Sequence, residues 1–290
     1  LALRRASYIF QDMNARDIAT ELLADYPQVR FDFDVTQELP LRAVCTQYRE
    51  SDLEFFSRLL ASEGLSWRFE HDQAEGDEDG GHGQARHRVV IFDSKAVAPV
   101  TPGGETLRFH GVRATERDDS IDEFRARRTV QANAVGISSW DPAQLIAPAA
   151  EQQSSLDAGE LPALSIYDGS GERIASDNGV AGPHSQLMLR ALELDNKVFE
   201  GAGAVRRLAA GHAFRLSQHD HYPEGDNAFT VLWVRHQARN NFQTGIAGAE
   251  STAGENGTYR NTFSCVRDVV AIVPPATAAP HPNTALGPQT

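Results

Sequence analysis

The sequence predicts a mainly β protein of the α+β class, and two observations carry this prediction. Residues 1–71 alternate strand-like and helix-like patterns, whereas from Gly104 onward short apolar–polar alternations are broken by glycine, proline, aspartate and serine. One later helix pattern, within residues 180–199, interrupts the second region. With 290 residues, of which 41% are hydrophobic and 23% charged, the chain can fold around a sizeable core.

The first predicted helix covers residues 15–24 and follows a strand end in residues 1–10. Asn14 precedes this helix and can accept a hydrogen bond from its free amide groups. Residues 30–35 then alternate, which predicts a strand. The side chains expected to face the core from this helix and strand are Ile18, Leu22, Leu23, Phe31, Phe33 and Val35.

A second helix is predicted after Ser51, where Ser51 and Glu54 have the spacing of a capping box before an apolar run. Asp52 and Glu54 lie in its first turn, where the helix dipole favours negative charge. Gly64 follows the last turn and can adopt the left-handed conformation that ends a helix. The apolar face of this helix is expected to consist of Leu53, Phe56, Leu59 and Leu60.

A strand and its return are predicted next. Residues 65–71 alternate, with Leu65, Trp67 and Phe69 on one side, and residues 88–93 form the returning strand. Between them, residues 72–87 are acidic, rich in glycine and free of large apolar side chains, which predicts a flexible hairpin loop. Their spacing does not fit the calcium-binding EF-hand pattern.

The region after Gly104 is predicted to be all-β apart from its one helix. Residues 143–163 are interpreted as a Pro/Ala/Gln-rich excursion, and Arg190 and Glu193 in the helix are spaced for an exposed ion pair. Residues 275–290 are rich in proline and predict an extended linker. The expected strand-forming runs are residues 106–112, 122–131, 134–141, 162–168, 204–218, 229–242 and 260–273.

The net charge and the two cysteines indicate which partners and which cross-links this chain is expected to lack. The net charge of −13 repels nucleic acid and anionic membranes, so neither is an expected partner. Cys45 and Cys265 both lie in strand-like apolar runs and are expected to be buried free thiols. We see no signal peptide and no apolar run of membrane-spanning length, and the start at Leu1 suggests a piece of a longer protein.

The strongest metal-ligand candidate is a group of three histidines, His212, His219 and His221. A His-x-His pair on a strand can point both rings to one face, and a third ring could complete a zinc site. Against this, residues 220–225 have the composition of a polar hairpin loop, beginning with Asp220. The sequence contains no nucleophile elbow, Walker loop or His-Glu-x-x-His pair, and we assign no catalytic, cofactor-binding or metal-binding residue.

Other polar clusters have simpler interpretations. Gly201 and Gly203 lack the third glycine of a dinucleotide fingerprint and are interpreted as a turn. The alternating arginines Arg125, Arg127 and Arg128 suit a channel lining, an interface or a solvated sheet face equally well. The paired carboxylates are expected to be solvated surface charges rather than acid–base pairs. They are Asp77, Glu78, Asp79, Asp118, Asp119, Asp122 and Glu123.

The stretch from Tyr48 to His71 closely resembles the signature of VgrG proteins, the spike of the type VI secretion system, within the wider phage late control gene D family of tail hub proteins. The matching segments in this stretch are Tyr48–Phe55, Ser57–Leu60, Glu63–Leu65 and Phe69–His71. Shorter matches follow in the same order at Ile9–Asp12, Ser165–Asp168, Thr230–His236 and Gly287–Thr290.

The resemblance implies a mechanical role and a β-barrel-like hub. In this family two barrel-like subdomains trimerise into a base that sits on a tube of Hcp hexamers, below an oligonucleotide-binding-fold domain and a β-helical spike. It implies that residues 1–103 are an α/β insert, 104–274 the second barrel and 275–290 a linker towards a needle, with the first barrel lying outside this chain. The implied partners are a homotrimer, Hcp and effector or adaptor proteins, and the implied location is the bacterial cytoplasm before firing and the exterior or a target cell afterwards.

Two other functions remain open from the residues. One is a metal-assisted hydrolase that uses His212, His219 and His221. The other is a carbohydrate- or peptidoglycan-binding β module that uses Trp67, Trp140 and Trp233. Two of the three tryptophans lie in alternating strand runs and are expected in the core, so the structural role is preferred.

Overall fold

The computed structural model describes the chain except for short segments, and it divides into two compact units. Unit 1 comprises residues 1–96, 130–196 and 271–290, and unit 2 comprises residues 97–129 and 197–270. The loop expected at 72–87 and the linker expected at 275–290 lie almost entirely outside the described residues. The described residues are 1–72, 86–110, 119–140, 145–156, 161–169, 178–239 and 258–275.

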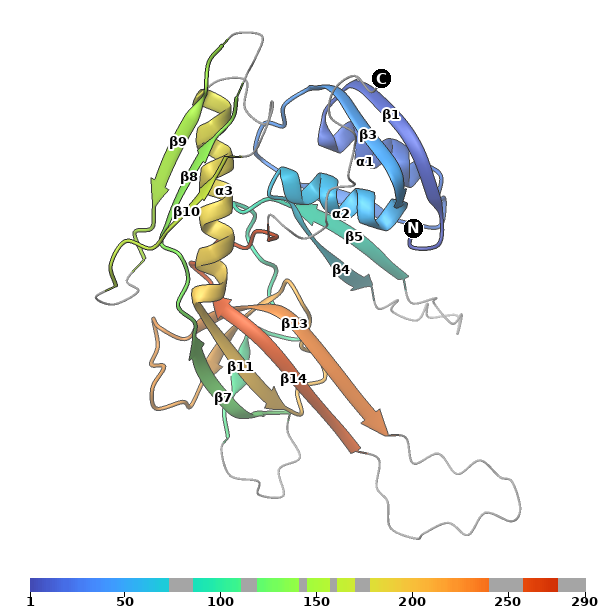
Figure 1. The fold of residues 1–290 in the computed structure, drawn as a ribbon. Helices are drawn as coiled ribbons and strands as arrows, with labels where there is room; N and C mark the ends of the chain where they lie inside the picture. Colours follow the sequence, from blue (N-terminus) through green and yellow to red (C-terminus); the bar gives the residue numbers. More distant parts are fainter. Residues whose placement is uncertain are drawn as a thin grey trace, which may run out of the picture. The chain divides into compact units, whose positions relative to one another are not determined.

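The first part of unit 1 combines two helices with two small sheets (Figure 1). β1 and β3 form an antiparallel pair. The second sheet has the order β2-β5-β4, parallel between β2 and β5 and antiparallel between β5 and β4. The elements are β1 (Arg5–Met13), α1 (Ala15–Ala24), β2 (Phe31–Asp34), β3 (Arg42–Ser51), α2 (Asp52–Ser62), β4 (Ser66–Asp72) and β5 (Arg86–Phe92).

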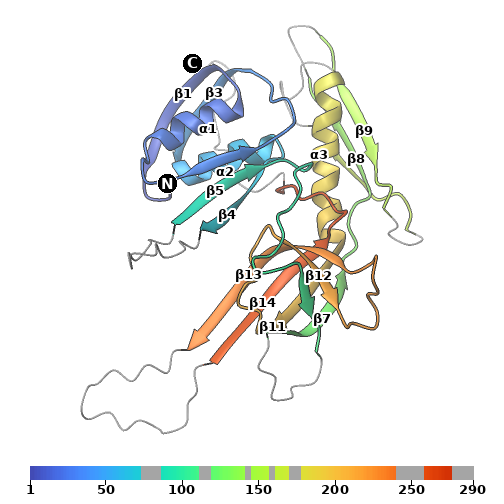
Figure 2. The ribbon, with the colours of Figure 1, turned by 180° about the vertical axis from the view of Figure 1, so that it is seen from behind.

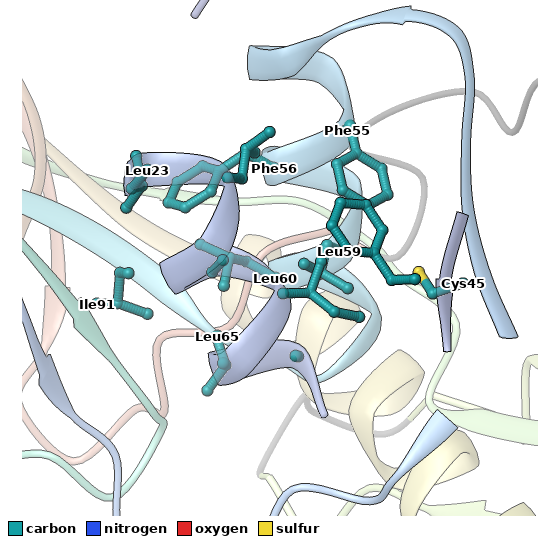
Figure 3. Packing of buried hydrophobic residues seen from close by; sticks show 13 residues of the cluster. Leu23, Cys45, Phe55, Phe56, Leu59, Leu60, Leu65 and Ile91 are labelled. Carbon is teal, nitrogen blue, oxygen red and sulfur yellow. The ribbon is translucent and has the colours of Figure 1, made fainter. Parts of the chain in front are cut away.

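Both predicted helix starts are confirmed. The Asn14 side chain accepts from the backbone amide of Asp17, and Ser51 and Glu54 form a complete capping box. The apolar face of α2 is corrected at one position. Phe55 is fully buried, whereas Leu53 is half-buried, because Phe55 and Leu59 lie one turn apart on the face that packs against α1, β1 and β5. Figure 3 shows Phe55 and Leu59 in this core.

Trp67 and Phe69 lie on one side of β4 as predicted, opposite the core residues Ile91 and Val89, but Trp67 is not the core residue that was expected. Trp67 and Phe69 are 40% and 45% exposed, although Leu65 just before the strand is buried. β4 is the edge strand of the order β2-β5-β4, so among the described residues a neighbouring strand flanks its side chains on one side only. On the opposite face Arg68 is buried, bonded to Glu70 and stacked on the Phe92 ring.

The second part of unit 1 is a three-stranded sheet with the long helix α3 (Asn178–Asn196) beside it (Figures 1 and 2). Its order is β10-β8-β9, with a small core that includes Val135, Ile137 and Leu189. β9 was missed by the sequence analysis, which interpreted residues 143–163 as an excursion. The strands are β8 (Ala134–Ser138), β9 (Ala149–Gln153) and β10 (Ser165–Asp168).

The exposed pair expected within α3 has other partners. Arg190 donates to the Ser94 hydroxyl at 3.1 Å, and Glu193 accepts from the Ser154 hydroxyl at 2.6 Å. Each side chain therefore bonds to a residue outside its own helix, and the two bonds tie α3 to other segments of unit 1.

Unit 2 is a six-stranded sheet that curls towards a barrel. Neighbouring strands are antiparallel except β6 and β12, and a bridge between Phe109 and Ile121 joins the two ends of the strand order. The buried side chains inside include Phe199, Phe214, Phe229 and Cys265. In sheet order the strands are β6 (Thr106–Arg108), β12 (Ala213–Ser217), β13 (Ala228–Arg239), β14 (Thr258–Arg267), β11 (Lys197–Gly203) and β7 (Ile121–Arg128).

Gly201 and Gly203 lie inside a central strand rather than in a turn, which corrects the sequence interpretation. Gly201 stands opposite Phe263 on β14 and Phe124 on β7. A Cβ at Gly201 would lie 2.3 Å from the Phe263 ring, and one at Gly203 would lie 2.3 Å from the Ser120 carbonyl oxygen. These glycines are required because rings and backbone approach them closely.

The alternation of β13 predicted that Trp233 lies in the core. A bulge in the strand explains why it does not. Val231 pairs with Cys265 and Trp233 with Ser264, so Leu232 is an extra residue on β13. One extra residue exchanges the two faces of the strand beyond it. Val231 is therefore buried, Trp233 is 50% exposed and Val234 packs against the core instead.

Candidate assembly surfaces and functional residues

The first feature of the Tyr48–His71 stretch is a buried carboxylate, Asp52, at the start of α2. Its Oδ2 accepts from Arg4 Nε at 2.6 Å and from the Tyr26 hydroxyl at 2.5 Å, and its Oδ1 accepts from Gln47 Nε2 at 2.8 Å. Burial alone would raise the pKa of Asp52, but hydrogen bonds from Tyr26, Gln47 and Arg4 outweigh it and lower the pKa. Asp52 therefore ties the residues before β1, the turn after α1 and β3 to the start of α2.

A second carboxylate, Asp93, holds the end of β5. Its Oδ2 accepts from the backbone amides of Thr36 and Gln37, and its Oδ1 accepts from the amide of Lys95. Burial would raise the pKa of Asp93, but these amide bonds lower it. Both aspartates are saturated by structural bonds, and neither has the exposure of a catalytic acid or base.

The three candidate histidines are divided between two environments. His219 lies among aromatic rings, 4.3 Å between ring centroids from Phe109 and 4.7 Å from Tyr222. His212 is buried elsewhere, with Nδ1 3.1 Å from the Ala210 carbonyl oxygen. Burial, followed by the charge of His221, lowers the pKa of His219.

This arrangement does not assemble the ligand set that the hydrolase hypothesis requires. The His219 and His221 ring centroids are 5.8 Å apart, and His219 Nδ1 accepts from the His221 backbone amide. Both histidines belong to the turn region between β12 and β13, as the composition of residues 220–225 predicted. Within the described residues, no three His, Cys, Asp or Glu side chains are grouped to hold a metal ion.

The carboxylate pairs that fall on described residues are engaged by arginines. Asp122 and Glu123 both bond to Arg260, and Asp119 bonds to Arg206. These carboxylates are in ion pairs within unit 2, on the sheet for Asp122 and Glu123 and in the connections beside it for Asp119, and they do not share a proton with one another. Asp118 and the acidic residues Asp77, Glu78 and Asp79 lie outside the described part of the chain.

The alternating arginines lie on the outermost strand of the unit 2 sheet, β7. Arg125 and Arg127 both contact the Glu200 carboxylate, at 2.7 and 3.1 Å. Their side chains remain 79% and 57% exposed. Both arginines therefore lie exposed on the last strand of the sheet order, and all three interpretations from the sequence (a channel lining, an interface and a solvated sheet face) stay open.

All three tryptophans are partly exposed. Trp140 is 47% exposed and lies just after β8, whereas Trp67 belongs to β4 and Trp233 to β13. Trp67 forms an edge-to-face pair with Phe69, with centroids 5.5 Å apart. The expectation that the strand tryptophans are core residues is wrong.

The β1–β3 pair has an exposed apolar face that was not predicted from the sequence. Phe10 and Cys45 pair across the strands and face the core, whereas Ile9 and Val44 are 68% and 59% exposed. Tyr48, at the start of the signature stretch, is 37% exposed on the same pair of strands. The signal was present in the sequence, because both strands carry large apolar residues at adjacent positions and so cannot bury all of them.

Both cysteines are buried free thiols, as predicted. Burial raises the pKa of the Cys265 thiol, which makes it unreactive. No helix in the described part of the chain is both long and apolar enough to cross a membrane.

Comparison with known proteins identifies relatives with named roles. The chain is 24% identical to the type VI secretion system spike protein VgrG1b of Pseudomonas aeruginosa, over 97% of this chain and 35% of that protein. It is 27% identical to VgrG4b of the same organism, over 100% of this chain and 35% of that protein. The chain thus spans about a third of the length of these curated relatives.

Two solved structures share the fold. The Escherichia coli c3393 protein, described as a type VI secretion component similar to T4 bacteriophage tail proteins gp27 and gp5, matches with a TM-score of 0.59 at 16% identity. That match covers 98% of this chain and 56% of the other. The prophage MuSo2 43 kDa tail protein of Shewanella oneidensis matches with a TM-score of 0.55 at 13% identity, over 91% and 69% of the two chains.

The family assignment rests on one further match, which spans most of both units. The family model described as phage tail baseplate hub (GPD) matches residues 1–242, from the residues before β1 to just beyond β13. This chain therefore belongs to the phage tail baseplate hub (GPD) family.

Proposed function

We propose that this chain is the hub region of a VgrG-type spike in a type VI secretion system, where it serves as a structural part of the puncturing device. The observation that carries the proposal is the family match over residues 1–242, together with relatives named as type VI secretion spike proteins along nearly the whole chain.

The proposed partners follow from the same family membership. We propose that the full-length protein is a homotrimer, that its base contacts an Hcp tube, and that effector or adaptor proteins travel with it. The exposed Ile9, Val44 and Tyr48 on the β1–β3 pair support an assembled rather than a free-standing state, because clustered exposed apolar side chains mark contact surfaces. The protein would reside in the bacterial cytoplasm before firing and then be exported.

We also propose a functional subdivision: an α/β insert at residues 1–103, a second barrel-like part at 104–274 and a linker at 275–290. The role assigned to this region is mechanical and not enzymatic. The separation of His212 from His219 supports that assignment, as do the saturated bonds of Asp52 and Asp93. One relative, from Vibrio cholerae, is named an actin cross-linking toxin, and the match covers 23% of its length.

The direct test is secretion by the source bacterium. Deleting the full-length gene, in a strain that lacks other genes for related spike proteins, should abolish the release of Hcp into the medium, measured by immunoblot. Expression of the full-length protein should restore it. Normal Hcp release from the deletion strain would overturn the proposal.

A second measurement tests the proposed trimer. Light scattering on the full-length protein at several concentrations should give three times the mass of one chain. The double substitution I9D/V44D places two charges on the exposed β1–β3 face, and the matched control K95D changes an exposed residue elsewhere in unit 1. A stable monomer at all concentrations for the unsubstituted protein would contradict trimer formation.

A further inference from the structure

Among the described residues, most of one side of the β7 backbone has no strand partner. It pairs with β11 along its whole length, from Arg128 opposite Lys197 to Ile121 opposite Gly203. On its other side, the described residues provide one bridge, from Phe109 to Ile121, at the beginning of the strand. Within the part of the chain that the structure describes, the backbone from Glu123 to Arg128 has no partner on this side, so an additional strand can pair with it there.

The side chains along this open edge are cationic. Arg125 and Arg127 alternate with Ala126 and so project from one face, where they share the single carboxylate of Glu200. One carboxylate cannot neutralise two guanidinium groups, and both side chains are more than half exposed. This face of the edge therefore keeps an excess of positive charge.

The opposite face of the edge is also cationic. Arg128 stands directly across from Lys197, whose ammonium group lies 5.4 Å from the centre of the Phe199 ring. Arg267 lies over the same ring at 5.4 Å. Lys197 and Arg267 therefore both lie over Phe199, Arg128 stands across from Lys197, and Arg267 bonds to Asp226.

Asp122 and Glu123, at the start of β7, are bonded to Arg260. With these included, six cations face four carboxylates, so the edge keeps a net positive charge. The cations are Arg125, Arg127, Arg128, Lys197, Arg260 and Arg267, and the carboxylates are Asp122, Glu123, Glu200 and Asp226.

This local charge is opposite to that of the whole chain, which carries −13. Two β7 edges brought together would place arginines against arginines, and like charges directly opposite one another destabilise a strand pair. The edge thus disfavours symmetric pairing with a second β7. An extended segment with carboxylates at alternate positions would instead place opposite charges across from Arg125 and Arg127.

We propose that the open edge of β7 accepts an acidic extended segment of a partner polypeptide as an added strand, with carboxylates opposite Arg125 and Arg127. Main-chain hydrogen bonds would supply the pairing and the arginines would select the charge. This inference goes beyond the proposed function, since it specifies a partner chemistry and an edge rather than an oligomeric state.

The test uses a fluorescein-labelled peptide of eight alternating threonine and glutamate residues, titrated with the full chain and followed by anisotropy. A threonine–lysine peptide tests charge selection. A third peptide keeps the glutamates and replaces the threonines with proline, which removes backbone donors without changing charge. We expect saturable binding of the first peptide and at least about fivefold weaker binding of the other two.

Matched variants localise the binding. R125Q/R127Q removes two arginines from the edge, and R215Q/R235Q removes two exposed arginines from β12 and β13 of the same sheet. The first should weaken binding of the threonine–glutamate peptide about fivefold or more, and the second should leave it unchanged. Circular dichroism of both variants establishes that each is folded.

Four outcomes would overturn the proposal. They are no binding of the threonine–glutamate peptide at millimolar concentration, equal binding of the proline peptide, equal weakening by both variants, and tighter binding of a single-stranded oligonucleotide than of the peptide. Equal binding of the proline peptide would mean that the edge is a charged surface that adds no strand. Tighter binding of the oligonucleotide would mean that the arginines bind phosphate groups rather than carboxylates.

Discussion

The two units bury their apolar side chains in different ways. In unit 1, α1 and α2 cover small sheets, and the core is built largely from aliphatic residues such as Leu59 and Leu60 on a capped helix. In unit 2 a single curled sheet encloses its own core, where Phe124, Phe199 and Phe229 meet ring to ring. The strands of a helix-covered layer can carry a side chain at each position. In a curled sheet filled with aromatic rings, a strand needs glycine where a ring lies directly against its backbone, as at Gly201.

The largest effect that we expect is at Phe56 in the helix-covered core. Replacing the buried Phe56 with alanine should lower the free energy of unfolding by about 3–5 kcal/mol, because the lost contacts leave a cavity between α1 and α2. Denaturant unfolding measures it. Phe69→Ala is the matched control, since Phe69 is 45% exposed in the same unit and should cost far less. Equal losses would contradict the assignment of the core.

The buried Asp52 carboxylate makes the free energy of unfolding of unit 1 depend on pH in the acidic range. Because hydrogen bonds from Tyr26, Gln47 and Arg4 outweigh burial and lower the pKa of Asp52, the folded state releases its proton more readily than the unfolded state. The stabilisation is fully present above the unfolded pKa of about 4 and disappears as the pH falls through the folded pKa.

We expect Asp52→Asn to lower stability by about 1.5–3 kcal/mol at neutral pH, the range for hydrogen bonds to a charged group. The difference from the unsubstituted chain should shrink steadily below about pH 4. Chemical unfolding at several pH values measures both. Asp32→Asn, an exposed aspartate on β2, is the control. A difference that stays constant down to pH 2 would show that the charge of Asp52 has no part in the effect.

Gly201 tests the ring-filled sheet of unit 2. A Cβ there would lie 2.3, 2.6 and 2.9 Å from three atoms of the Phe263 ring, which is fully buried and has little room to move. Gly201→Ala should therefore cost about 1–3 kcal/mol by overpacking. Gly182→Ala in α3 is the control, because no atom lies within 4 Å of the added Cβ. A stability of Gly201→Ala equal to that of the control would show that the ring can shift.

The two units also differ in how far their folds could be predicted from the sequence. The capping box joins Ser51 to Glu54 within four residues, so local sequence was enough to place the start of α2. The conformation of Gly64, with φ of 69°, is likewise a local matter. The role of Gly201, in contrast, depends on Phe263, 62 positions along the chain, and no nearby residue reports it.

The candidate site was harder to predict than the fold. The order of motifs along the chain indicated the family, and the match over residues 1–242 agrees with it. Alternation identified Arg125 and Arg127 as neighbours on one face, but only the sheet order shows that β7 is at an edge. The exposure of Trp67 has the same origin, since a strand pattern does not reveal whether a strand is central or outermost.

The smallest effect that we expect is at Trp233, where the bulge in β13 turns a large aromatic side chain outward. Trp233→Thr should cost less than about 1 kcal/mol, since the ring is half-exposed and threonine suits a strand surface. Val231→Ala, two residues earlier, should cost about 2 kcal/mol, because Val231 is fully buried opposite Cys265. The smaller side chain would thus have the larger effect. A greater loss at Trp233 than at Val231 would mean that the strand keeps its alternation and that Leu232 is not the extra residue.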